Sequence, residues 1–119
     1  MHRIGPARAD FPIYEGNARM HNTPAALAHI AAPTDAVHVE DWIDWNDTGQ
    51  FERHMRGTRR AVAGVEIRIT GWQDARGQVE RHASVWATDT QLDAAALRKL
   101  AALALDAADE LDELGGTAR

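Results

Sequence analysis

Apolar and polar residues alternate from residue 61 to residue 88, and this period of two predicts a β-hairpin with one buried face. Residues 74–78 suit a three-residue turn in which Gly77 takes a left-handed conformation. This turn fixes the register, because a slip of one residue would mix the two faces. The predicted apolar pairs are Val65 with Ala87, Ile67 with Val85 and Ile69 with Ala83.

The reverse face of this hairpin combines aromatic and charged residues. The same register places Glu66 opposite Trp86, Arg68 opposite Ser84, Thr70 opposite His82 and Trp72 opposite Glu80. Two tryptophans are therefore predicted on the solvent-facing side. Trp and Arg are enriched at the energetic centres of interfaces, because one such side chain buries a large area and keeps a polar end satisfied. This face is a candidate interaction surface.

Two shorter elements are predicted before the hairpin. Thr23 and Pro24 form a helix start, and the apolar run after them stops before Pro33, which predicts a short helix near residues 24–32. Residues 37–45 alternate like a strand, with Trp45 on the inner face. Residues 48–58 fit one or two helical turns or an extended segment, and the sequence leaves both open. The outer face of the predicted first strand carries His38, Glu40 and Trp42.

The C-terminal part predicts a long helix. Asp93 is placed to cap its start, and Gly115 with Gly116 terminates it. Its predicted main stripe consists of Leu97, Leu100, Ala101, Ala104, Ala108 and Leu111. Leu103, Leu105 and Leu114 make the stripe wider than one sheet face requires, which indicates a second contact.

These elements predict an α+β fold, in which a three-stranded antiparallel sheet carries the long C-terminal helix on one face, with the short N-terminal helix at its rim. Residues 1–22 are expected to form an irregular arm, residues 23–116 a single domain and residues 117–119 a frayed tail. At 119 residues, of which 45% are hydrophobic, the chain is long enough for one real core. We expect it to be cytoplasmic, because its N-terminus has no signal-peptide pattern and no run is long enough for a membrane helix.

The leading functional hypothesis is a small non-enzymatic domain that forms a homodimer and has an accessory or regulatory interaction with another protein. The surface would be the Trp-bearing face or the wide helix stripe, since exposed apolar patches of this size mark interaction sites. Residues Phe11, Ile13 and Tyr14 of the arm could instead cover one of these tryptophans. The candidate interface residues are Trp42, Trp72, Trp86, Arg68, His82, Leu103 and Leu114.

An RNA- or ribosome-associated module is the alternative, since Arg53, Arg56, Arg59 and Arg60 form a basic segment beside a sheet with aromatic residues. The net charge of −5 argues against broad binding to phosphates. An ion network with the acidic residues of the same chain, or between subunits, is the favoured interpretation of these arginines. Nucleic acid is therefore the less favoured partner.

Enzymatic chemistry ranks third. An acidic cluster of Glu40, Asp41, Asp44 and Asp47 is the only hint of hydrolase-type catalysis, and clusters near a strand end are usually solvated. The absence of cysteine excludes thiol nucleophiles, thiolate metal sites and disulfides. The six histidines show no paired metal spacing, and the best metal candidate is His38 with Glu40 and His82. We predict no catalytic residue, metal or cofactor.

In residues 60–114 a predicted hairpin is followed by an Ala/Leu-rich helix. The helix motif consists of residues 92–97, then Leu100 and Ala101, then residues 107–109. In this they resemble the C-terminal half of small uncharacterised actinobacterial domains. The resemblance implies a compact β-β-β-α fold of unknown function and assigns no functional residue. The Cys/His-rich front end of some of these domains is not matched here.

Overall fold

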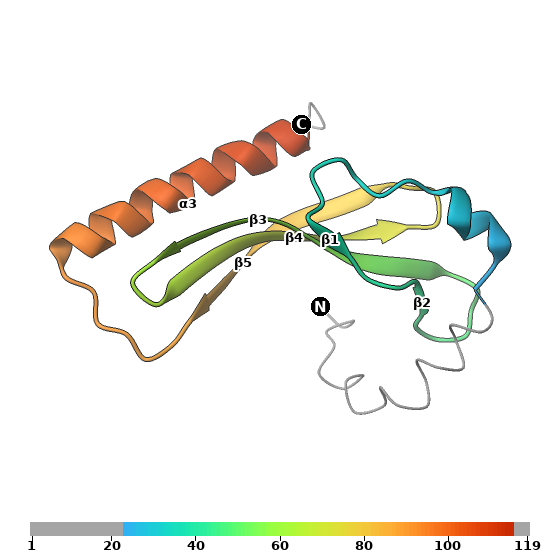
Figure 1. Ribbon diagram of the computed structural model, residues 1–119, viewed down its shortest axis with the longest axis horizontal. Helices are drawn as coiled ribbons and strands as arrows, with labels where there is room; N and C mark the ends of the chain where they lie inside the picture. The colour runs from blue at the N-terminus through green and yellow to red at the C-terminus, as the bar shows by residue number, and fades with distance from the viewer. Residues whose placement is uncertain (1–22, 116–119) are drawn as a thin grey trace.

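The computed structural model describes residues 23–115 (Figure 1). They form an antiparallel sheet covered on one face by a helix, which confirms the α+β class. This described part contains five strands, whereas three were predicted. The elements in chain order are the 3-10 helix η1 (Ala25–His29), β1 (His38–Val39), β2 (Ile43–Asp44), β3 (Phe51–Val62), β4 (Val65–Asp74), β5 (Val79–Ala87) and the helix α3 (Ala94–Leu114).

The β4–β5 hairpin has the predicted turn and register. Gly77 adopts a φ of 88°, and the backbone N–H of Asp74 donates to the carbonyl of Gln78 at 2.8 Å. The side chain of Asp74 also accepts the N–H groups of Arg76 and Gln78, which holds the turn. The predicted apolar pairs are confirmed: Val65 with Ala87, Ile67 with Val85 and Ile69 with Ala83.

Residues 51–62 form a long strand, β3, which settles the question left open for residues 48–58. The prediction that the hairpin strand begins at residue 61 was wrong, because Ala63 and Gly64 form a tight turn and Ala61 and Val62 end β3. Because the turn has two residues, Val62 pairs with Val65 and shares its face, which is the one covered by the helix. Ala61 pairs with Glu66 and lies on the opposite face from the one predicted for it. Ala63 supplies the left-handed conformation of this turn, with a φ of 49°.

The predicted strand at residues 37–45 is split into the short strands β1 and β2, which both pair with β3. Between them the chain leaves the ladder, so the alternation no longer decides which way a side chain points. Trp42 was expected on the uncovered face, and this was wrong: only 8% of it is exposed, and it packs against Leu27 and Phe51. The predicted helix at residues 24–32 is the shorter η1.

Two segments cover one face of the sheet, called here the inner face. The helix α3 lies over one half, where Ile67, Ile69 and Ala107 form the core (Figure 1). The chain between η1 and β1 contacts the other half through three inner-face side chains. Arg53 donates to the carbonyl of Ile30, Gln73 donates to that of Ala31, and Arg81 forms two hydrogen bonds with Asp35.

The helix α3 begins and ends as predicted, but a different stripe of it contacts the sheet. The carboxylate of Asp93 accepts the N–H of Ala96 at 2.8 Å, which confirms the predicted cap. Much of the predicted main stripe is exposed, including Leu97, Ala101, Ala104 and Ala108. The residues that pack against the sheet core are Leu100, Leu103, Ala107, Leu111 and Leu114.

Candidate interaction surface

The strand β5 is the last strand of the sheet, whose order is β1, β3, β4, β5. No strand within residues 23–115 pairs with its outer edge. The pairing with β4 runs through nine consecutive residue pairs without a bulge. The result is a long, regular edge strand, which presents a row of backbone donors and acceptors to any segment that can pair with it.

Alternation along β5 identifies the backbone groups that point outward. At one end the carbonyl of Gln78 accepts from Asp74, and at the other the N–H of Thr88 donates to Gly64, so even-numbered residues face β4. Because hydrogen-bonding direction alternates along a strand, odd-numbered residues direct their N–H and C=O groups to the free edge. These residues are Val79, Arg81, Ala83, Val85 and Ala87.

Two neighbouring large apolar side chains are exposed on this strand. Val85 is 67% exposed and Trp86 is 64% exposed, although the partner of Val85 on β4, Ile67, is 4% exposed. The side chain of Val85 lies on the inner face and that of Trp86 on the reverse face, called here the outer face. The apolar surface therefore wraps around the edge of the sheet at these two residues.

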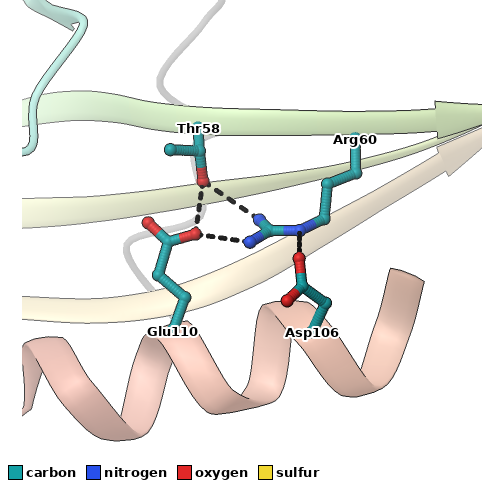
Figure 2. A network of polar contacts seen from close by, with 4 residues as sticks. All are labelled: Thr58, Arg60, Asp106 and Glu110. Carbon is teal, nitrogen blue, oxygen red and sulfur yellow. Dashed lines mark hydrogen bonds and ion pairs between the residues drawn. The ribbon is translucent and has the colours of Figure 1, made fainter. Parts of the chain in front are cut away.

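A network of polar contacts sets the rotation of α3 about its axis (Figure 2). Arg60 of β3 donates to Asp106 at 3.0 Å and to Glu110 at 2.7 Å, and the hydroxyl of Thr58 also donates to Glu110 at 2.7 Å. This flank of α3 therefore faces β3. The opposite flank faces the β5 side and consists of small and apolar residues that are all exposed: Leu97, Ala101, Ala104 and Ala108.

A hollow of about 340 Å³ lies at the end of the sheet where β3 turns into β4. Trp86 lines it together with Arg59, Ala61 and Glu66. The hollow is wide open, so it offers one wall of contact and not the enclosure that small-molecule sites have. Trp86 is thus a shared border of this hollow and of the free β5 edge.

The other predicted outer-face residues lie where the register places them. Arg68 binds Glu66 at 3.1 Å, and Glu66 also binds Arg59 at 2.9 Å; these two hydrogen bonds from the arginines lower the pKa of the Glu66 carboxyl. His82 is exposed opposite Thr70. Trp72 is half-buried, and its ring meets that of Trp45 edge to face, with centroids 5.7 Å apart. The prediction of Trp45 on the inner face was therefore wrong, because this contact is made on the outer face. Trp72 and Trp86 therefore share a face, and Trp42 lies on the other one.

Two helix candidates, Leu103 and Leu114, pack on the sheet core of the same chain. The second contact that the wide stripe indicated would therefore need other residues of α3. Leu97 and Leu105 are the large apolar residues that the helix leaves exposed. The predicted covering of a tryptophan by Phe11, Ile13 or Tyr14 lies outside the described residues.

Sequence reasoning missed His54, which the β3–β4 pairing sets against the Trp72 ring at a centroid distance of 5.0 Å. Its Nδ1 lies 3.7 Å from a carboxylate oxygen of Glu40. Burial lowers the pKa of His54, the Glu40 charge opposes this, and the charges of His82 and Arg56 lower it further. The parity of the strand at residues 51–62 would have revealed this position, had that segment been assigned as a strand.

The arginines of the basic segment are largely occupied within the chain. Arg53 lies over the Trp42 ring, 4.4 Å from its centroid, and donates to Gln73. Arg59 binds Glu66, and Arg60 binds Asp106 and Glu110, so the favoured interpretation as an ion network is confirmed for these two residues. Arg56 is half-buried on the outer face, opposite Thr70.

The acidic cluster has a structural role at Asp44. Its carboxylate accepts the backbone N–H groups of Thr48 and Gly49, at 3.0 and 2.9 Å, and so organises the turn between β2 and β3. His38 and His82 share a row across the sheet, but two strands separate them, which is about 14 Å at the usual strand spacing. Between residues 23 and 115, no group of three or more potential metal ligands gathers.

Comparison with protein families, curated proteins and solved structures gave no match to this chain. The resemblance of residues 60–114 to actinobacterial domains therefore stays a prediction. Of the described part of the chain, no helix is long and apolar enough to cross a membrane.

Proposed function

We propose that this chain is a non-enzymatic protein-interaction domain that self-associates as a homodimer through the β5 side of its sheet. Its biological role would be an accessory or regulatory interaction with another protein, made by the assembled dimer. The observation that carries the proposal is the exposure of two consecutive large apolar residues, Val85 and Trp86, one on each face of an edge strand with which no other strand of residues 23–115 pairs on its outer side. Large apolar side chains gathered at one place mark interaction sites.

The charge distribution supports a protein partner over a nucleic acid. Arg59 and Arg60 would have to give up carboxylate partners of their own chain before they could bind phosphate. The β5 side offers apolar surface and backbone hydrogen-bonding groups, which recognise another polypeptide. A twofold dimer is the commonest closed assembly for a small domain, because one self-complementary surface is used twice.

The solution mass tests this proposal. Light scattering across a range of protein concentrations should give twice the chain mass for the parent, and the Val85→Lys variant should shift to the monomer mass, because a charge would enter the contact. Leu105→Lys is the matched control, since Leu105 is 68% exposed and lies on the outward side of α3. A monomeric parent at every concentration, or a Val85→Lys dimer as stable as the Leu105→Lys dimer, would rule the proposal out.

A further inference from the structure

The two free edges of the sheet differ in how well they are protected against pairing. On the β3 side, the β3–β4 ladder has an irregularity between Arg56 and Arg59, and two consecutive charged residues, Arg59 and Arg60, stand where regular pairing resumes. Bulges and charged side chains are the devices by which proteins prevent pairing at an edge. The β5 edge has neither bulge nor proline, its nine residues are in regular register, and its charged residues, Glu80 and Arg81, are confined to the first half of the strand. Of the two edges, β5 is therefore the one that is open to another strand.

The sequence of β5 is asymmetric along its length in a way that suits its own antiparallel copy. The first half carries all of its charged and titratable groups, which are Glu80, Arg81 and His82. The second half carries the exposed Val85 and Trp86. An antiparallel copy would set the charged half of each strand against the apolar half of the other, so no charge would face a like charge across the pair.

One register uses the whole strand. If the twofold axis passes at Ala83, all nine residues pair, from Val79 with Ala87 to Arg81 with Val85. The outward backbone groups of the odd-numbered residues then meet as hydrogen-bonded pairs. Ala83, with its small side chain, lies on the axis. Asp35 holds the guanidinium of Arg81 within the same chain. The hydrocarbon stem of Arg81 then covers Val85 of the second copy.

We infer that two copies of this chain join their β5 strands antiparallel about a twofold axis at Ala83, forming one continuous sheet. This inference rests on the proposed function and specifies its contact. On the inner face, the exposed flank of α3 with Leu97, Ala101 and Ala104 looks toward the second copy. On the outer face, Glu80 of each copy lies opposite Trp86 of the other, so the hollow beside Trp86 gains a second wall.

Single cysteines can test the register, because the chain has none of its own. In the inferred register, position 82 faces position 84 of the other copy in a non-hydrogen-bonded pair, with Cβ atoms about 5 Å apart, close enough for a disulfide after small adjustments. Positions 82 and 82, or 84 and 84, would be separated diagonally by about 7–8 Å. His82→Cys and Ser84→Cys chains carrying different affinity tags should therefore be co-expressed and oxidised.

The expected main product is a disulfide-linked dimer that carries both tags, whereas either variant alone stays largely uncrosslinked. Asp109→Cys, exposed on α3, is the control for random collision. A strong Ser84→Cys homodimer would move the axis to Ser84 and overturn the inferred register. A dimer by light scattering with none of these crosslinks above the Asp109→Cys level would overturn β5 pairing and leave self-association standing. A monomer by light scattering would overturn both.

Discussion

The guanidinium of Arg60 on β3 lies 2.7 Å from the carboxylate of Glu110 on α3, and this contact connects the sheet to the helix at a point where both side chains are mostly buried. Hydrogen bonding to Glu110, strengthened by Asp106, raises the pKa of Arg60. The contact fixes how α3 is rotated about its axis: the flank with Asp106 and Glu110 faces β3, and the opposite flank stays exposed. It thereby helps to decide which α3 residues are available for other contacts.

Replacement of Glu110 by alanine is expected to destabilise the domain by about 1–2 kcal/mol. Thr58 loses the acceptor of its hydroxyl, and Arg60, whose side chain is only 14% exposed, keeps Asp106 but loses the shorter of its two carboxylate contacts. Urea denaturation monitored by tryptophan fluorescence measures this change. The matched control is Asp109→Ala, an exposed neighbour on the same helix. Equal stability of the two variants would show that the network adds nothing to the docking of α3.

Gly71 allows β4 and β5 to approach closely. A Cβ atom at this position would lie 2.7 Å from the carbonyl oxygen of Glu80, a backbone atom that cannot move without disturbing the ladder. Gly71→Ala is therefore expected to cost about 1–3 kcal/mol of stability through overpacking.

Gly57→Ala is the matched control for that substitution, since its Cβ would meet nothing closer than 3.5 Å. Both are glycines within strands, so the general difference between glycine and alanine cancels in the comparison. Urea denaturation of the two variants should rank Gly71→Ala as clearly less stable. The reverse order would mean that the close approach of β4 and β5 is not a constraint.

His54 should make stability depend on pH. Its pKa is lowered in the fold, mainly by burial, so the unfolded chain takes up the proton first as the pH falls. The stability contributed by the neutral imidazole is complete above the ordinary histidine pKa of about 6.5 and decreases as the pH falls from there through the lowered folded pKa. His54→Gln should therefore lose less stability than the parent upon acidification.

The measurement is urea denaturation at about pH 7.5 and about pH 5.5, on either side of the ordinary histidine pKa. His29→Gln is the control, because His29 is exposed on η1. The His54→Gln variant should show a smaller loss of unfolding free energy between the two pH values than His29→Gln. Parallel losses in both variants would assign the pH dependence to other groups.

The sequence by itself determined the elements whose signals are local. The period of two and the glycine at position 77 specified the β4–β5 register, because the pleat and the turn leave one pairing that keeps the faces apart. Asp93 specified the start of α3, since an N-cap side chain bonds to the backbone three residues later. The presence of a tryptophan on the outer face at Trp86 followed from the same register.

Only the tertiary structure decided how these elements meet. Residues 51–58 became part of a strand because β4 offered them a partner. Trp42 turned inward because the chain leaves the ladder between β1 and β2. Helical periodicity permits several apolar stripes on α3 to face the sheet. The observed stripe packs Leu103 and Leu114 against the sheet and leaves Leu97 exposed. In this orientation of the helix, Arg60 contacts Asp106 and Glu110. Long-range partners of this kind leave no periodic signal in the chain, since each depends on residues far apart in sequence.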